Sequence, residues 1–379
     1  MRITLPNTHE RLGALRIYSP GRIVELDSVQ PEPKAAIERG LLHVGVSALE
    51  DAQRRMTIVI PVKDERRSTL RGVLTAIPGA CRIVVISASK RSPIDRFELE
   101  REVISAFARI TGRTVLHFHQ SDPLVGELVA DTGMSELVED GRVRPGKGEA
   151  MLLGTMVADA AGSDAVGFID ADNYVPGAVN EYVRIYAATM ATAASRYVMN
   201  RISWLSKPKV ENDQLVFNRW GRSTAVSNRA LNEVLSHYLG EGTSIITTGN
   251  AGEHMMSLPL ARILRMSGSF AAETGQLVDL MEQFGGIIDP IRAEPIEGMV
   301  DVYQTETINP HFHEDKGADH VEAMRRVSLG SIAHSPICPP AVADAFGGDF
   351  PAPVRYPPLE TVDSVLDFER LQGEWGVGP

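Results

Sequence analysis

An apolar run that stops at two carboxylates constrains this chain more than any other feature. Residues Val166 to Ile169 are apolar or small, and Asp170, Ala171 and Asp172 follow them directly. Two Asp residues at a strand end supply oxygen ligands that can hold Mg²⁺ or Mn²⁺ against the diphosphate of a nucleoside-diphosphate sugar. Two Asp residues can equally begin an ordinary turn before the Pro-Gly pair at 176–177. The rest of the chain has to decide between these interpretations.

The segments before this motif alternate between strand and helix patterns. Apolar runs predict strands at 56–60, 82–87, 115–119 and 165–169, and other segments predict helices that include 70–76 and 149–161. The resulting order, β-α-β-α-β-α-β, is typical of an α/β fold with a mostly parallel sheet flanked by helices. Ligands bind beyond the carboxyl ends of such strands. The two carboxylates would therefore lie at the ligand-binding edge.

Composition favours a soluble enzyme over other classes of protein. The 379 residues are 43% hydrophobic and 23% charged, which allows one large or two smaller cores. The net charge of −11 argues against nonspecific nucleic-acid binding, which needs a basic surface. The first residues lack the apolar core of a signal peptide, and no run approaches the roughly 18 apolar residues of a membrane span. We expect a cytoplasmic protein with no nucleic-acid or membrane partner.

Three regions are expected along the chain. An N-terminal segment (1–50) packs on a nucleotide-sugar-binding core (51–255), and a C-terminal region (256–379) follows. Local patterns predict a strand pair at 15–18 and 22–26 with a Pro-Gly turn, an extended tail at 336–358 and a last helix at 362–371. The two cysteines, Cys81 and Cys338, are expected to be buried thiols, because they form neither a disulfide framework nor a zinc-thiolate pattern.

A lysine between two glycines opens the predicted helix at 149–161. In Arg144-Pro145-Gly146-Lys147-Gly148, backbone N–H groups and the Lys147 ammonium can face an anion or a nucleobase at a helix N-terminus. A Pro-Gly turn before a helix explains the same letters structurally. The spacing excludes a Walker A loop, which requires G-x-x-x-x-G-K-[ST].

Two histidines alternate near residue 312. His311 and His313 would lie on one side of an extended segment, and a neutral imidazole is a good ligand for borderline metals. In isolation a pair of this kind is more often a pair of surface residues. The Asp pair elsewhere in the chain raises the expectation that one imidazole completes a metal site begun by Asp172.

Two further clusters are candidates for substrate binding. The segment 247–255 is rich in small residues and contains Glu253, which can bind sugar hydroxyls or serve as a first-turn helix residue. The segment 218–229 concentrates three arginines and two hydroxyls around Gly221. Arginine with backbone and hydroxyl donors binds small phosphates and carboxylates. The second cluster therefore suggests a small anionic acceptor.

Together these stretches resemble the mannosyl-3-phosphoglycerate synthases, which are retaining glycosyltransferases of the GT-A fold. The resemblance covers about residues 1 to 340 and is most specific in T-G-N-A-G-E-H followed by N-P-H-x-H-E. The matching segments are 60–65, 167–174, 220–222, 248–254, 309–314 and 334–336. The resemblance implies transfer of mannose from GDP-mannose to the 2-hydroxyl of 3-phosphoglycerate, which gives the precursor of the compatible solute mannosylglycerate.

Site residues are carried over from the resemblance by position. It implies donor contacts from Pro61, Lys63, Glu65, Ser87, Lys147, Asp170, Ala171 and Asp172. It implies acceptor contacts from Gly221, Arg222, Thr224, Asn250, Gly252 and Glu253. The divalent metal, Mg²⁺ or alternatively Mn²⁺, Co²⁺ or Zn²⁺, would be held by Asp170 and Asp172 with His311 or His313, of which His311 is preferred. Asp172, Glu253 and Lys147 are the expected catalytic residues, and the family's tendency to dimerise predicts a homodimer.

Several alternatives remain at this point. A glucosyl donor would depend on small differences in pocket shape around the sugar hydroxyls. A nucleotidyltransferase normally carries a longer glycine-rich loop after its first strand, and a noncatalytic sensor would not need both the Asp pair and the histidines. The transfer itself can be a front-face attack or a double displacement, for which Glu253 is the best carboxylate.

Overall fold

One large mixed sheet organises the protein. The structure is a computed structural model, which describes residues 1–26, 36–38, 40–211, 214–218, 221–289, 291–292, 296–313 and 317–379. The strand order is β18-β9-β8-β7-β12-β16-β13-β17-β4-β1-β6-β5, and a branch adds β3 beside β17 and β2 beside β3. The strands of this sheet are β1 (Arg2–Thr4), β2 (His9–Leu12), β3 (Leu15–Tyr18), β4 (Gly21–Glu25), β5 (Ala36–Glu38), β6 (Leu41–His43), β7 (Met56–Val62), β8 (Arg82–Ser87), β9 (Val115–His119), β12 (Ala165–Phe168), β13 (Tyr197–Ser203), β16 (His254–Ser257), β17 (Val300–Glu306) and β18 (Gly376–Val377).

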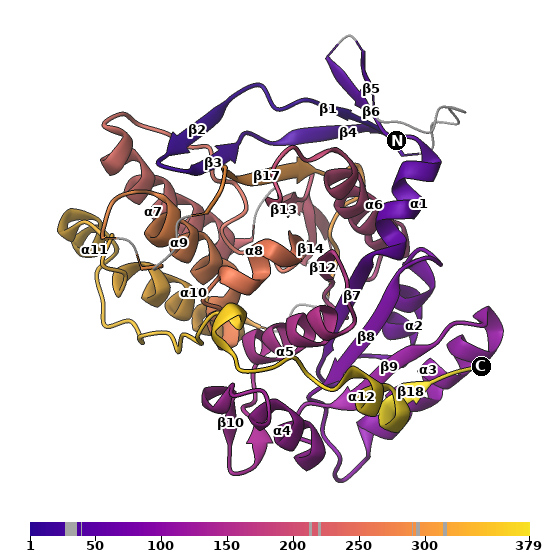
Figure 1. Ribbon diagram of the computed structural model, residues 1–379. Helices are drawn as coiled ribbons and strands as arrows, with labels where there is room; N and C mark the ends of the chain where they lie inside the picture. Colours follow the sequence, from indigo (N-terminus) through magenta and orange to yellow (C-terminus); the bar gives the residue numbers. More distant parts are fainter. Residues whose placement is uncertain are drawn as a thin grey trace.

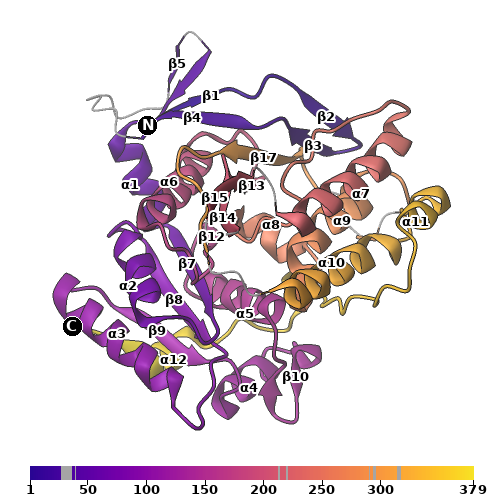
Figure 2. The ribbon, with the colours of Figure 1, turned by 180° about the vertical axis from the view of Figure 1, so that it is seen from behind.

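Helices cover both faces of the sheet (Figures 1 and 2). On one face lie α1 (Val46–Arg54), α2 (Arg67–Ala76), α3 (Arg96–Thr111) and α6 (Pro176–Thr192). On the other face lie α5 (Lys147–Ala160), α7 (Arg222–Leu239), α8 (Leu258–Ile263), α9 (Ala272–Phe284) and α10 (Ala318–Ala333). The remaining elements are α4 (Pro123–Ala130), α11 (Pro340–Phe346), α12 (Phe368–Trp375), 3₁₀ turns at 135–137, 269–271 and 359–361, and two hairpins, β10 (Val138–Glu139) with β11 (Arg142–Val143) and β14 (Lys207–Glu211) with β15 (Gln214–Asn218).

The period of two in the central strands explains this arrangement. Along β7, Ile58 and Ile60 belong to the core beneath α1, α2 and α6, whereas Val59 belongs to the core beneath α5 and α9. All three side chains are fully buried. Successive side chains of a strand point to opposite faces, so a continuous apolar run marks a strand covered on both sides. The near-continuous apolar runs therefore predicted the central strands correctly.

The predicted parallel unit is confirmed. Strands β8 and β12 flank β7, and β9 lies beside β8, all parallel. Helix α4 and the β10–β11 hairpin are inserted before α5, which begins at Lys147 rather than at 149. Beyond β12, the antiparallel β16 separates this unit from the parallel pair β13 and β17.

Four local predictions were wrong or incomplete. The strands at 15–18 and 21–25 do not pair with each other, because each lies parallel to a different part of β17. The tail at 336–358 contains α11, and the last helix begins at Phe368, after a 3₁₀ turn at 359–361. In Figure 1 the yellow tail passes α5 on its way to α12. Cys81 is buried as expected, but Cys338 is half-buried.

Within the described part of the chain, none of the helices combines the length and the apolar character needed to cross a bilayer.

Two helix-interior glycines generate a stability prediction. A Cβ on Gly154 in α5 would stand 2.4 Å from Cγ1 of Val59 in β7, whereas a Cβ on Gly373 in α12 would meet nothing within 4 Å. Gly154→Ala should lower the free energy of unfolding by about 1–3 kcal/mol through overpacking. Gly373→Ala should raise it by about 0.5–1 kcal/mol, because alanine is the better helix former. Urea denaturation of both variants tests this, and equal effects would contradict the packing of α5 on β7.

Candidate active site

The candidate site lies where the parallel strands end. Strand β12 delivers Ile169, whose N–H donates to Val59 O at 3.1 Å, and Asp170 and Asp172 follow in the loop. The N-terminus of α5, through Lys147, and the loop before β16, through Gly252, both approach Asp170 in this loop. As predicted, the Asp pair follows the carboxyl end of a parallel strand, which is the edge where sheets of this kind bind ligands.

Lys147 is held between two carboxylates. Its Nζ lies 2.6 Å from Asp170 Oδ1 and 2.8 Å from Glu273 Oε1, the latter in the first turn of α9. Burial alone would lower the pKa of Lys147, but the two carboxylates outweigh it and raise the pKa well above its ordinary value. The ammonium is therefore charged at any physiological pH.

Gly252 permits this arrangement. A Cβ at this position would stand 2.5 Å from Asp170 Oδ2 and 2.9 Å from Lys147 Nζ. Because such distances are shorter than van der Waals contact, a side chain at this position would displace the ion pair, and glycine lets the loop before β16 approach it. The small-residue cluster at 247–255 therefore contributes a close backbone approach, which sequence reasoning had proposed for a substrate rather than for an ion pair.

Asn173 connects the Asp loop to the rest of the site. Its Nδ2 donates to Asp170 O at 2.7 Å and to Glu253 Oε1 at 2.9 Å, and its Oδ1 lies 3.1 Å from Nδ1 of His311. One buried amide thus joins three segments distant in the chain. Asn173 lies in the matching segment 167–174, but no role was predicted for it, because its partners become neighbours only through the fold.

The imidazole of His311 is buried and neutral, as a metal ligand has to be. Its ring stacks on Trp204 with centroids 4.6 Å apart, and the His313 ring lies 4.9 Å away. Burial lowers the pKa of His311 well below its ordinary value, and the positive charge of Lys207 adds to this. With Nδ1 facing Asn173, Nε2 is the nitrogen left for a metal.

Glu253 is fully buried beside this histidine. Its Oε2 has no hydrogen-bond partner among the described residues, whereas Oε1 accepts from Asn173. Burial raises the pKa of Glu253 to about 8, and the charge of Asp170 contributes to the shift. A buried carboxyl oxygen without a partner is costly unless a ligand pairs with it. Glu253 is therefore suited to bind a substrate hydroxyl.

The proposed metal residues form a partial site. Among the residues that the structure describes, no three His, Cys, Asp or Glu side chains are grouped closely enough to hold a metal ion by themselves. Asp170 is moreover engaged with Lys147. A carboxylate from Asp172 and a neutral imidazole from His311 fit a divalent cation that takes its other ligands from donor phosphates, as Mg²⁺ usually does.

The residues predicted to contact the nucleobase lie in and around a polar loop after β7. Lys63 is exposed and Glu65 half-buried, whereas Ser87 is fully buried and its hydroxyl accepts from Ser89 N–H. Asp64 has a φ of 61°, rare for a residue other than glycine, and its N–H donates to Ser89 Oγ at 2.6 Å. Pro61 lies within β7, which extends to Val62 and so is two residues longer than the predicted strand at 56–60.

Three of the residues predicted to contact the acceptor lie at the N-terminus of α7. Gly221 is the N-cap residue, and Thr224 is buried in the first turn. The side chain of Arg222 and the whole of residues 219 and 220 lie outside the described residues. Asn250 has both ends of its amide bonded within the protein, to Ser328 Oγ and from Thr274 Oγ1. Its predicted acceptor contact would require rearrangement of these bonds.

Sequence reasoning missed Glu273, Trp204 and Lys207. Glu273 pairs with Lys147, Trp204 stacks on His311, and Lys207 Nζ lies 3.7 Å from the centroid of the Trp204 ring. Two of them lie in or beside the β14–β15 hairpin, where no motif pointed to them. A cation within 6 Å of an aromatic face is attracted to it, but the residue spacing does not reveal such a contact.

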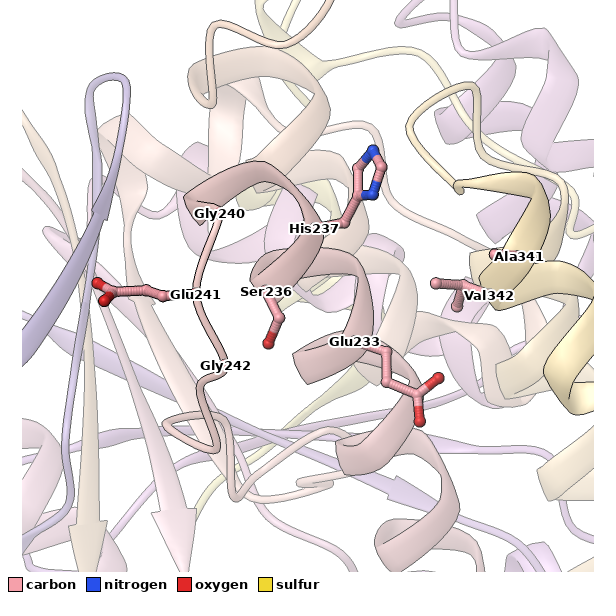
Figure 3. Close-up of a pocket in the computed structure, with 8 residues that line it drawn as sticks. All are labelled: Glu233, Ser236, His237, Gly240, Glu241, Gly242, Ala341 and Val342. Atoms are coloured by element: carbon pink, nitrogen blue, oxygen red, sulfur yellow. The ribbon is translucent and has the colours of Figure 1, made fainter.

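A surface hollow at the other end of α7 is a poor alternative site (Figure 3). It lies between the C-terminal end of α7 and α11 and is lined by Glu233, Ser236, His237, Gly240, Glu241, Gly242, Ala341 and Val342. Figure 3 shows Glu233, His237 and Glu241 pointing in different directions. The helix has 18 residues, so its ends are about 27 Å apart at 1.5 Å per residue. The hollow is therefore remote from the Asp pair.

Comparisons with known proteins agree with this geometry. A family described as mannosyl-3-phosphoglycerate synthase matches residues 5–352. The mannosyl-3-phosphoglycerate synthase of Pyrococcus furiosus is 37% identical over 337 residues, which are 88% of this chain and 85% of that protein. The one from Aeropyrum pernix is 40% identical over 336 residues, 88% of this chain and 86% of that protein.

Solved structures identify the fold. A crystal structure of glucosyl-3-phosphoglycerate synthase from Mycobacterium tuberculosis with Mn²⁺, uridine diphosphate and glucosyl-3-phosphoglycerate has a TM-score of 0.54 at 21% identity, covering 82% of this chain and 94% of that one. The same enzyme with Mn²⁺, uridine-diphosphate-glucose and phosphoglyceric acid gives 0.53 at 21% identity, covering 82% and 93%. The fold is of the GT-A class, as predicted.

The Lys147 ion pairs generate a prediction about stability. Lys147→Met leaves Glu273, only 2% exposed, buried without its cation, so the variant should lose about 3–5 kcal/mol of unfolding free energy. The folded-state pKa of Lys147 lies above its unfolded value of about 10.4, so the loss should be full from about pH 6 to 9 and shrink only above about pH 10. Chemical denaturation across this range measures it.

Two variants control this experiment. Adding Glu273→Gln to Lys147→Met should restore part of the stability, because it removes the uncompensated charge. Lys90 is exposed, and Lys90→Met should change the unfolding free energy by less than about 0.5 kcal/mol. A Lys147→Met protein as stable as the Lys90→Met protein would show that the ion pairs contribute little.

Proposed function

This chain belongs to the mannosyl-3-phosphoglycerate synthase family, and we propose that it transfers mannose from GDP-mannose to the 2-hydroxyl of 3-phosphoglycerate with retention of configuration. It is a glycosyltransferase, as the sequence motifs predicted. The observation that carries the proposal is the hydrogen-bonded cluster of Asp170, Asn173, Glu253 and His311 at the strand ends. It brings the family's separate motifs into one site.

The donor would bind along the carboxyl ends of β7, β8 and β12. The loop of Lys63 and Glu65 faces the guanine, and the Lys147 ammonium stands where negative charge grows on the departing diphosphate. Asp172 and His311 would hold a divalent cation, which neutralises diphosphate charge when bound. The Mn²⁺ in the solved relatives supports a divalent cation in general, and we propose Mg²⁺ as the physiological one.

The transfer itself is proposed as a front-face attack. The bond between the mannosyl carbon and the diphosphate oxygen breaks, and the acceptor 2-hydroxyl oxygen bonds to that carbon from the same face. The proton of the hydroxyl passes to the leaving phosphate oxygen. Glu253 positions a sugar hydroxyl through its unpartnered Oε2. Because burial raises the pKa of Glu253 to about 8, its carboxyl is mostly protonated at neutral pH and a weak nucleophile.

An acceptor-dependent release of GDP tests the activity. GDP-mannose with Mg²⁺ or Mn²⁺ should release GDP only when 3-phosphoglycerate is present, and Asp172→Ala and His311→Ala should each lower kcat at least about 100-fold. Mn²⁺ binding in the presence of GDP, followed by electron paramagnetic resonance, should weaken in both variants. Release with GDP-glucose at equal kcat/KM would contradict the proposed donor, and no release with any phosphorylated acid would contradict the acceptor.

The front-face route predicts the absence of a covalent intermediate. The enzyme is mixed with GDP-mannose, with and without acceptor, rapidly quenched and analysed by intact-mass spectrometry. No protein species about 162 Da heavier, the mass that one hexosyl group adds, should be found. Glu253→Gln, which keeps a hydrogen-bonding side chain, should retain more activity than Glu253→Leu. A mannosyl adduct on Glu253 would establish double displacement instead. The proposed homodimer is tested separately by light scattering.

A further inference from the structure

Lys207 occupies a position that the known motifs do not explain. It opens β14, and its ammonium lies 3.7 Å from the centroid of the Trp204 ring. The same indole stacks on His311, with centroids 4.6 Å apart. Lys207 and His311 thus both contact the Trp204 ring, which connects the lysine to the candidate metal ligand.

The lysine also faces the first turn of α7. A Cβ on Gly221 would stand 3.8 Å from Lys207 Cδ, 3.9 Å from its Nζ and 3.9 Å from Thr224 Oγ1. The ammonium and the threonine hydroxyl therefore border one space beside Gly221. Among the described residues no side chain caps this end of α7, so its first N–H groups can also donate to a ligand. Ammonium, hydroxyl and helix N–H groups together are typical donors to a phosphate.

The two lysines of the site differ in their partners. Lys147 is paired with two carboxylates, whereas Lys207 makes no ion pair or hydrogen bond with any residue in the described part of the chain. Burial lowers the pKa of Lys207 to about 8, although the charges of Glu253, Asp170 and Asp172 oppose this shift. A half-buried ammonium without an anion is costly, and an anionic ligand would relieve the cost.

We propose that Lys207 binds the phosphate of the acceptor, together with Thr224 and the first N–H groups of α7. The inference rests on the proposed function and adds a residue outside the acceptor set that the motifs supply. In 3-phosphoglycerate the phosphate and the reacting 2-hydroxyl are on adjacent carbons. A phosphate held between Lys207 and α7 therefore fixes the hydroxyl within a short distance, on the side of the site where His311 and Glu253 lie.

Binding of 3-phosphoglycerate to the metal-free protein tests this without turnover. Isothermal titration calorimetry should show Lys207→Met binding it about 10- to 100-fold more weakly than the wild type, the range for a lost charge-assisted hydrogen bond. Lys207→Arg, which keeps the charge, should lose clearly less. The control Arg109→Met removes one positive charge from an exposed position on α3 and should bind like the wild type. Equal binding by Lys207→Met and wild type would overturn the inference.

Acceptor analogues determine which group the lysine holds. If it binds the phosphate, Lys207→Met should weaken glycerol 3-phosphate as strongly as 3-phosphoglycerate and leave glycerate within about twofold. A loss for glycerate but not for glycerol 3-phosphate would overturn the assignment in favour of the carboxylate. In turnover assays the substitution should raise the KM for the acceptor more than it lowers kcat.

Donor binding separates failure of the inference from failure of the proposed function or of folding. Lys207→Met should bind GDP with Mn²⁺ within about threefold of the wild type and unfold at a similar temperature. If it does so and also binds 3-phosphoglycerate normally, only the role of Lys207 is wrong. If the wild type binds GDP but none of the three acceptors, the proposed acceptor is wrong and the inference falls with it.

Discussion

The site depends on one ammonium group between two carboxylates. Lys147 joins the start of α5 to the end of β12 through Asp170 and to the start of α9 through Glu273. Apolar packing between these elements does not by itself fix the direction of a loop. The ion pairs do so because opposite charges in a partly desolvated place favour a particular geometry. Asp170, fixed in this way, accepts the hydrogen bond of Asn173, which in turn orients Glu253 and His311.

Much of the fold was predictable because it depends on local patterns. The central strands are apolar on both faces. A continuous apolar run therefore identifies such a strand from its own residues, without knowledge of the strands beside it. The Asp pair was predictable for a similar reason, since the end of such a strand and the ligand-binding edge coincide in every parallel α/β sheet. Lys147 followed from its position at the start of a helix. Each of these inferences uses only a few consecutive residues.

The features that were missed depend on distant partners. Strands β3 and β4 follow each other closely, yet each pairs with β17, almost 300 residues away in sequence. A short connection with Pro and Gly suggested a hairpin, but the hydrogen bonds of an edge depend on which strand arrives beside it. Helix α11 lies in the proline-rich tail because Pro340 occupies a first-turn position, where the missing N–H costs nothing. Lys207 had no local signal at all.

The charges of the site explain why the two lysines have different surroundings. Around Lys147 and Lys207 the described residues place four carboxyl groups, from Asp170, Asp172, Glu253 and Glu273. With Glu253 protonated, the three remaining carboxylates face two ammonium groups and the guanidinium of Arg201 among the described residues, and a diphosphate donor would add about two further negative charges. The cations among the described residues do not balance this sum, and a divalent cation on the donor side would offset it. The acceptor phosphate needs positive charge that the carboxylates have not already neutralised. Lys147 does not meet this condition, because both of its partners are in place before any substrate arrives. Lys207 meets this condition, because its ammonium packs on the uncharged indole of Trp204.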